Sequence, residues 1–346
     1  STSQSAEVKT ESSGTTETKK PEASKNAAKI GDTEYASIAD AMKVATPCDT
    51  IKLLKDITES VEVKVAKNFG GELTIDLNTY SINGDTANQC IWQTYRTYCY
   101  PQKLIVKNGT LKNAGSGSAI WWKGDLEVVN CRFEKNQGGA IQSGSGNTTI
   151  VDSTFEENHS GNAAGAAVQL TDNVECTITG SDFSGNATNN IGGAVYVDDG
   201  TLDITDCTFE GNSAGFGGAI AVADVEKLTM GNNTNCLDNK ATSCGGGIYA
   251  IRSTATFEPG SALRGNSSTY GGAIYVDTSN IHIAANSAVY NNTATTAGDD
   301  LFFFNNSTFT LPNAKDMSGD LILSSDNMEI TGWYHDGWYK WNAAQG

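Results

Sequence analysis

The sequence predicts an all-β chain folded as a right-handed parallel β-helix, and two interleaved repeats together with short stretches of strand-like alternation predict it. The first repeat is a large residue followed three positions later by Asn, and its consecutive starts are separated by 22, 28, 26, 27, 27 and 26 residues. The second is led by glycine, most often Gly-Gly, a small residue and an aliphatic one, with starts separated by 27, 27, 25, 28, 26 and 27 residues. A fixed period of roughly 20 to 50 residues is typical of repeat architectures.

Each period contains strand-like pieces separated by turns, with no helical pattern. Leu202–Ile204 alternates apolar and polar residues, Ile220–Val222 follows a glycine pair, and Gly, Asn and Ser cluster between these pieces. Alternation with a period of two indicates strands. Strands this short cannot each enclose a hydrophobic core of their own. We therefore expect them to stack as coils around one continuous apolar column. Each coil then lengthens the rod by about 4.8 Å.

The asparagines of the first repeat share one phase, and we expect them to stack as a ladder along the rod. Asn tolerates a left-handed turn conformation, and its amide is able to hydrogen-bond to the turns on either side. The repeated glycines permit close approach between coils. We interpret both sets as structural. The ladder residues are Asn136, Asn158, Asn186, Asn212, Asn239, Asn266 and Asn292.

The two repeats resemble those of the polymorphic outer-membrane protein family, which read FxxN and GGA followed by an aliphatic residue. The first is matched by FEKN (133–136), FSGN (183–186) and FEGN (209–212), and the second by GGAI (138–141), GGAV (192–195), GGAI (217–220) and GGAI (271–274). The matching repeats lie within residues 110–301. The resemblance implies a surface-exposed β-helix with adhesin-like roles.

The ends of the chain differ in composition from its repeats. Residues 1–28 are dominated by Ser, Thr, Glu, Lys and Ala, so we expect a disordered tether. Residues 29–66 predict a strand, a short helix capped by Ser37 and ended by Pro47, and further strands. Such a cap closes the open end of a β-helix, and it resembles the first segment of the pectate-lyase-like superfamily. We expect the β-helix over 67–323, with an aromatic insertion at 86–102, and an aromatic C-terminal cap over 324–346.

Composition excludes several classes of partner. The formal net charge is −17, which is unfavourable for binding nucleic acid or other polyanions. No run approaches the roughly 20 apolar residues that a membrane span needs, so we expect no membrane insertion. No CxxC or paired-His spacing indicates a metal site, and we expect no cofactor. The family resemblance implies an extracellular or cell-surface location.

The cysteines are interpreted in two groups. Cys131 and Cys207 share a phase three coils apart, which separates them by roughly 14 Å, and a disulfide cannot span that distance. We expect both to be small buried thiols. Cys90 and Cys99 flank the aromatic part of the insertion and are predicted to form a disulfide.

An outward row of aromatic residues is the main candidate binding surface. The residue after each repeated aliphatic position is expected to point away from the core, on one face of the rod. Aromatic surfaces suit sugar rings and protein partners, although these rings are also expected to stack between coils for stability alone. The aromatic members of this row are Trp121, Tyr196, Tyr249, Tyr275 and Phe302. The insertion adds Trp92 and Tyr95 as binding candidates, with a lid packed on the rod as the alternative.

The sequence therefore predicts an adhesin-like module that presents one β-helix face to a glycan or a host surface protein. One alternative is a carbohydrate-active enzyme, either a polysaccharide lyase or a glycoside hydrolase. Hydrolysis uses two carboxylates, for which Asp198 and Asp199 are the candidates, although adjacent aspartates on a turn are usually only solvated. The other alternative is a passive stalk or filament subunit that self-associates. Fold alone does not choose among these functions.

Overall fold

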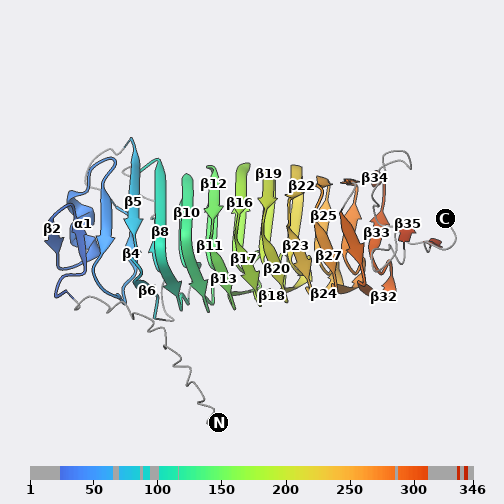
Figure 1. Cartoon of the computed structure of the whole chain (residues 1–346), viewed down its shortest axis with the longest axis horizontal. Coiled ribbons are helices and arrows are strands. Elements are labelled where there is room, and N and C mark those ends of the chain that lie inside the picture. Colours follow the sequence, from blue (N-terminus) through green and yellow to red (C-terminus); the bar gives the residue numbers. More distant parts are fainter. Residues whose placement is uncertain are drawn as a thin grey trace, which may run out of the picture.

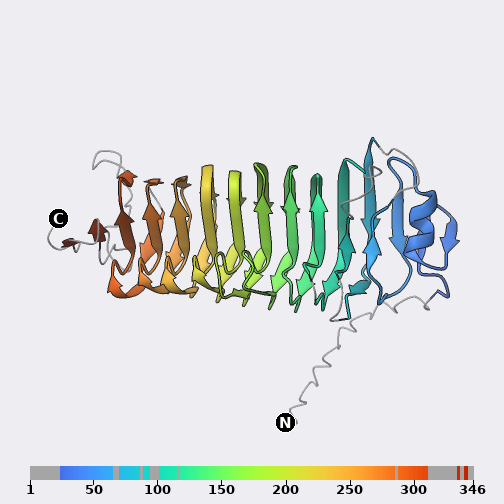
Figure 2. The same cartoon turned by 180° about the vertical axis from the view of Figure 1, so that it is seen from behind.

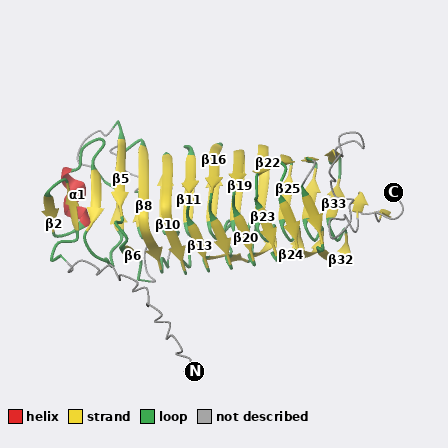
Figure 3. Cartoon of the chain, viewed as in Figure 1, coloured by secondary structure: helices red, strands yellow, loops and turns green. Residues whose placement is uncertain are grey.

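The computed structural model of the 346-residue protein describes residues 24–64, 70–85, 89–93, 101–115, 117–284, 287–310, 333–335 and 339–341. These residues form a rod of stacked coils that runs from the N-terminal cap at one end to β33 and β35 at the other (Figure 1). The view from behind shows the same continuous stack (Figure 2). Strands make up almost all of the regular structure, and the helix α1 lies at the N-terminal end (Figure 3).

The N-terminal cap forms because a hairpin and a helix cover the first coil. Strands β1 (Ala28–Ile30) and β2 (Thr33–Tyr35) pair antiparallel, and β1 also pairs antiparallel with β3 (Thr50–Leu53). Helix α1 (Ile38–Val44) begins at Ser37, whose hydroxyl accepts the Asp40 backbone N–H over 3.0 Å. The helix buries its apolar face, as its spacing predicts.

The cap begins earlier than the sequence predicts. Ala27 and Ala28, which we assigned to the end of the tether, are buried. The side-chain amide of Asn26 also donates to Glu34 over 2.9 Å. The last part of the predicted tether therefore belongs to the folded cap, because Ala28 lies in β1 and the Ala27 backbone N–H donates to the Tyr35 carbonyl over 3.0 Å. Residues 1–23 lie outside the described part of the chain.

A full coil passes through four short strands, and strands at the same position in successive coils pair in parallel to form four columns. Column 1 follows the glycine motif and contains β4 (Val61–Glu62), β7 (Ile91–Trp92), β9 (Ile120–Lys123), β11 (Ile141–Gly144), β15 (Val168–Thr171), the first parts of β19 (Val195–Thr205) and β22 (Ile220–Gly231), β25 (Ile248–Ile251), β29 (Ile274–Asp277), β33 (Leu301–Phe304) and β35 (Trp333–His335). Strand β36 (Tyr339–Trp341) pairs antiparallel with β35.

The other three columns complete each coil. Column 2 contains β3, β5 (Glu72–Asp76), the first parts of β8 (Lys103–Lys112) and β10 (Asp125–Glu134), β12 (Thr148–Val151), β16 (Val174–Thr179), the later parts of β19 and β22, β26 (Thr254–Phe257), β30 (Asn280–Ile283) and β34 (Thr308–Thr310). Column 3 contains β6 (Ser81–Asn83), the later parts of β8 and β10, β13 (Thr154–Glu156), β17 (Asp182–Ser184), β20 (Thr208–Glu210), β23 (Asn235–Leu237), β27 (Ala262–Arg264) and β31 (Ala288–Tyr290). Column 4 contains β14 (His159–Gly161), β18 (Ala187–Thr188), β21 (Ser213–Phe216), β24 (Lys240–Cys244), β28 (Ser267–Tyr270) and β32 (Thr293–Ala297).

The core is one apolar column that runs through the stacked coils. Alternate residues of each strand point inward, so like residues meet in successive coils. In column 3, the rings of Phe133, Phe155, Phe183 and Phe209 stack with centroids 4.8, 4.6 and 4.6 Å apart and planes within 8° of parallel. All four rings are fully buried. This interior stack explains why the large residue of the first repeat recurs.

Part of the predicted insertion at 86–102 is regular coil. Ile91 aligns with Ile120 and is fully buried, and Trp92 aligns with Trp121 in column 1. Trp92 therefore belongs to the outward row rather than to an excursion, because Ile91 occupies the core position that precedes it. Residues 86–88 and 94–100, including Tyr95, lie outside the described residues.

Candidate functional site

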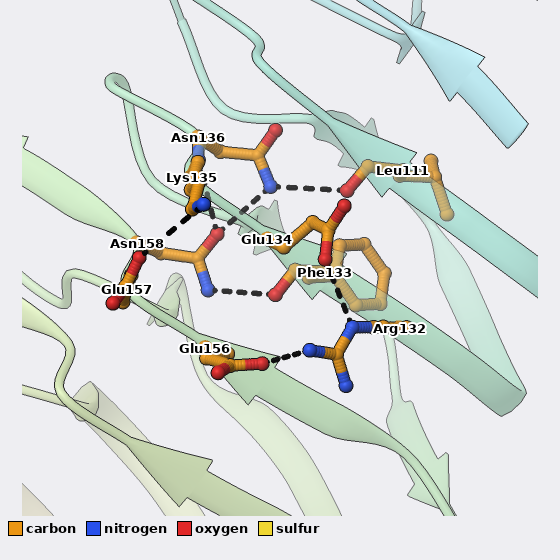
Figure 4. Close-up of polar contacts among 9 residues, drawn as sticks. All are labelled: Leu111, Arg132, Phe133, Glu134, Lys135, Asn136, Glu156, Glu157 and Asn158. Atoms are coloured by element: carbon orange, nitrogen blue, oxygen red, sulfur yellow. Dashed lines mark hydrogen bonds and ion pairs between the residues drawn. The ribbon is translucent and has the colours of Figure 1, made fainter.

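The asparagine ladder forms the frame on which the outer surface is built. Each ladder asparagine donates a side-chain amide N–H to the side-chain oxygen of the next, over 2.8–3.0 Å. Each also donates to a backbone carbonyl, as Asn158 does to Phe133 over 3.1 Å (Figure 4). The ladder ends where Asn292 donates to the Asp300 carboxylate over 2.8 Å. These amides are buried and their hydrogen bonds are made within the rod, which leaves them a structural role.

The outward row of column 1 is in continuous register along the rod. The aligned residues are Trp92, Trp121, Gln142, Gln169, Tyr196, Ala221, Tyr249, Tyr275 and Phe302. The row begins at Glu62, which aligns with Trp92, and its aromatic residues are interrupted by two glutamines and an alanine. Ala221 is fully buried, so the stripe predicted from the sequence is not a uniform line of rings.

The rings gather into one cluster in the C-terminal half of the rod. Tyr249 stacks on Tyr275 with centroids 5.4 Å apart, and Tyr275 stacks on Phe302 at 5.2 Å. Column 4 contributes Phe216, tilted against Tyr249 at 5.3 Å, and Tyr270, edge-on to Phe302 at 5.3 Å. We call these five residues the aromatic ledge. It lies across the glycine turns that join column 4 to column 1.

Phe216 closes the gap that Ala221 leaves in the row. Both residues belong to the same coil, on either side of Gly217, which has a left-handed φ of 65°. A Cβ built on Gly217 would lie 2.9 Å from the Cβ of Ala221, so the turn requires glycine. Phe216 is 37% exposed, and Phe304, two residues beyond Phe302, is 38% exposed. Phe216 is therefore an exposed ring within the ledge, whereas Phe302, which the sequence places in the outward row, is buried and only 5% exposed.

A charged corner follows column 1 beside the ledge. Arg252 pairs with Asp224 of the preceding coil through two contacts of 2.6 Å, which lower the pKa of the Asp224 carboxyl below its usual value. The charges of Asp198 and Asp277 also act on Arg252. The corner thus offers three carboxylates and one guanidinium within one turn row, a polar rim along the ledge.

The tyrosines of the row are held in their neutral form. Burial, the charge of Asp198 and a hydrogen bond to Asp198 raise the pKa of Tyr196 to about 12. Burial also raises the pKa values of Tyr249 and Tyr275, and the neighbouring Cys244 and Asp277 add to the effect. These hydroxyls therefore stay protonated, and able to donate hydrogen bonds, further into the alkaline range than an ordinary tyrosine hydroxyl.

The two candidate catalytic aspartates do not form a convergent pair. Asp198 is the hydrogen-bond partner of Tyr196, whereas Asp199 is exposed, has a left-handed φ of 71° and accepts the Gly200 backbone N–H over 2.9 Å. Successive residues at a turn face different ways, so one substrate bond is not placed between them. Among the described residues, no group of three or more His, Cys, Asp or Glu is arranged to hold a metal ion.

The cysteines that the structure describes are free thiols. Cys90 is a free, buried thiol whose Sγ lies 3.5 Å from the Ile82 carbonyl oxygen, and burial raises its pKa to about 12. Cys90 faces the core, and Cys99 lies outside the described residues, so the Cys90–Cys99 disulfide stays a prediction. Cys131 and Cys207 are free and buried, as expected.

The comparisons with known proteins agree with the fold. The model of the family described as a right handed beta helix region matches residues 65–235, slightly less than half of the chain. The matched segment covers the first interior phenylalanines and the start of the ledge at Phe216. No curated protein and no solved structure matches the chain. The rod is a right-handed parallel β-helix.

Sequence reasoning missed part of the ledge and its rim. Phe216 and Tyr270 each stand directly before a repeated glycine, at aligned positions of column 4. A large residue in that place is the signal that would have found them. The Arg252–Asp224 pair joins residues 28 positions apart, and only the coil register brings them together. Helix α1 is not long and apolar enough to cross a membrane, nor is any other helix within the described ranges.

Proposed function

We propose that this chain is an extracellular or cell-surface binding module with an adhesin-like role, and that the aromatic ledge contacts a glycan. The observation that carries the proposal is the clustering of five rings where the fold does not require them. The same column 1 position holds Gln142 and Gln169 in other coils with the same backbone register. Phe216 is exposed and the three ledge tyrosines are half-buried, and partly exposed aromatic groups that gather in this way are typical of binding surfaces.

The chemistry of the surface favours a neutral glycan. Ring edges and half-buried faces offer apolar contact for sugar C–H groups, and the tyrosine hydroxyls with the charged corner offer hydrogen bonds for sugar hydroxyls. The aspartates of the corner and the net charge of −17 repel acidic polymers. A neutral polysaccharide or a neutral mucin-type chain offers C–H and hydroxyl groups for these contacts and carries no negative charge to be repelled.

The repeats support the proposed location. Their resemblance to polymorphic outer-membrane protein repeats, and that of the cap to the pectate-lyase-like superfamily, is the basis for proposing surface exposure. The acidic, strand-rich rod with its polar outer positions is compatible with that setting. We extend the resemblance to exposure and binding, and not to any catalytic activity.

The test is retention of the protein on immobilised mucin, galactan, mannan and xyloglucan, scored together with the appearance of new chain ends. The double variant Tyr249→Ser/Tyr275→Ser should bind at least about tenfold more weakly than the parent, because truncating central aromatic contacts commonly costs more than 1 kcal/mol each. The matched control is Gln142→Ser/Gln169→Ser, at the same column positions outside the ledge. Circular dichroism establishes that both variants remain folded.

The outcomes separate the candidate functions. Retention that the ledge variant loses and the control keeps supports the proposal, whereas equal retention by all three proteins contradicts it. New chain ends would instead favour the carbohydrate-active enzyme. The mutual stacking of Tyr249, Tyr275 and Phe302 also suits a passive stalk. That function predicts no retention, together with self-association measured by light scattering.

A further inference from the structure

A polar notch lies on the same side of the rod as the start of the ledge. It is a depression of about 350 Å³ lined by Gln137, His159, Gly161, Ala187, Asn189 and Ser213, together with Thr188. Ligand pockets for small molecules begin at about 300 Å³, so the space fits a single sugar residue. All of these residues belong to the part of the chain that the structure describes.

The notch exists because small side chains replace large ones in column 4. His159, Ala187, Ser213 and Lys240 are aligned in successive coils, so two small residues lie between two long ones. This leaves a recess whose floor is a methyl and a hydroxymethyl group. Its N-terminal wall is the imidazole of His159.

A bulge in β14 widens the recess. The register shifts between His159 and Gly161, where β14 uses an extra residue against Ala187 and Thr188. Gly161 has a left-handed φ of 60°, and a Cβ built on it would meet nothing within 4 Å. Bulges are common beside binding sites, where they redirect side chains.

Hydrogen bonds fix the far wall of the notch. Asn189 donates its backbone N–H to Gly161 over 2.7 Å and its side-chain amide to Asn162 over 3.2 Å. Thr188 donates its hydroxyl to the carbonyls of Gly161 and Ala163 over 3.1 and 2.6 Å. The wall is therefore held in place before any ligand arrives, which lowers the entropic cost of binding.

The lining selects an uncharged, hydroxyl-rich ligand. Gln137 and Asn189 supply amides, His159 an imidazole and Ser213 a hydroxyl, and Ala187 supplies an apolar floor. None of the lining side chains is a carboxylate, and the ammonium group of Lys240 in the next coil is exposed and does not line the space, so a charged ligand group would lack an ionic partner inside the notch. Sugars combine hydroxyl groups with apolar C–H faces, and this lining offers partners for both.

The notch and the ledge are joined by the strands that contain them. Strand β21 begins at Ser213 in the notch and ends at Phe216 on the ledge, about 10 Å further along. In the preceding coil, Asn189 lies in the notch, and Ile191 pairs with Phe216. A chain on the ledge that turns along β21 at Phe216 therefore reaches the notch within one short strand length.

We propose that this notch binds the terminal, uncharged sugar residue of the glycan whose following residues lie on the aromatic ledge. The inference rests on the proposed glycan-binding function and adds end recognition to it. A chain end seated in the notch would make binding depend on which sugar terminates the glycan, whereas the ledge alone would accept any neutral chain.

The test uses saturation-transfer difference NMR with the methyl glycosides of glucose, galactose, mannose and N-acetylglucosamine as probes. At least one should receive saturation from the parent protein. Ser213→Phe, which fills the notch, should abolish that signal, whereas Ser267→Phe, in the same column two coils further on, should leave it unchanged. His159→Ala should weaken binding of the same methyl glycoside about tenfold through lost hydrogen bonds and contact.

The same variants separate failure of the notch from failure of the proposed function. Absence of any signal with the parent, or an unchanged signal in Ser213→Phe, would overturn the notch proposal. If Ser213→Phe keeps its retention on the immobilised polysaccharides while Tyr249→Ser/Tyr275→Ser loses it, the ledge binds glycan and end recognition is wrong. If neither variant loses retention, the proposed function fails and end recognition fails with it, and a methyl glycoside signal lost in Ser213→Phe would then show only that the notch binds a single sugar.

Discussion

Two stacks of aromatic rings run along this rod, one inside it and one on its surface. In the interior stack, Phe133 to Phe209, centroids are 4.6–4.8 Å apart and planes lie within 8°. On the ledge, Tyr249, Tyr275 and Phe302 are 5.2–5.4 Å apart, with planes 8° and 19° from parallel. Phe216 and Tyr270 pack against them at 53° and 61°.

The difference in geometry and burial between the two stacks indicates a different role for each. Interior rings are spaced by the coil rise and surrounded by the core, so both faces of the central rings are used for packing. Ledge rings also stack on one another, but Tyr249, Tyr270 and Tyr275 are only half-buried and Phe216 is 37% exposed, so part of each of these four rings remains accessible at the surface. The interior stack stabilises the coils, and the ledge is the part of the surface with unused contact capacity. Stability should therefore depend on the first stack and binding on the second.

The largest expected effect tests whether stability depends on the interior stack and not on the ledge. Phe183→Ala should lower the free energy of unfolding by about 3–5 kcal/mol, since it removes a fully buried ring and leaves a cavity. Tyr275→Ala should lower it by only about 1–2 kcal/mol, because its ring is partly exposed. Urea denaturation followed by circular dichroism measures both. Equal losses would show that the ledge is chiefly a structural stack.

The next effect concerns the ladder beside the interior stack. Asn186→Ala should lower the free energy of unfolding by about 2–4 kcal/mol, because it leaves the Asn158 amide and the Phe155 carbonyl without their partners in the buried ladder. Glycan retention by the folded variant should be unchanged. Asn147→Ala, at an exposed position, is the matched control and should cost less than about 0.5 kcal/mol. If Asn186→Ala and Asn147→Ala lower the free energy of unfolding by similar amounts, the buried ladder does not stabilise the rod more than an exposed asparagine does.

The contrast between the two stacks also explains which features of the structure were predictable from the sequence. The recurrence of Phe and Asn at one phase identifies interior positions, because every coil must satisfy the same packing and the same turn. Surface positions obey no such rule: Gln142, Ala221 and Tyr249 are equally compatible with the backbone. The row was therefore predictable, whereas its clustering with Phe216 depends on how two columns meet across a glycine turn. The burial of Cys90 was not predictable for a related reason, since spacing alone did not show that it faces the core.

The smallest expected effect concerns the ionisation of Tyr196, at the edge of the ledge. The pKa of Tyr196 is about 12, above its ordinary value of 10.0, so folding favours the protonated hydroxyl. Its contribution to stability should be intact below pH 10 and should be lost as the pH rises from 10 to 12. Absorbance titration at alkaline pH should show a late tyrosinate phase that Tyr196→Phe reduces by one residue. If Tyr196→Phe leaves that phase unchanged, Tyr196 ionises freely and the hydrogen bond to Asp198 does not hold it; if the phase shrinks, the rim of the ledge is ordered before a ligand binds.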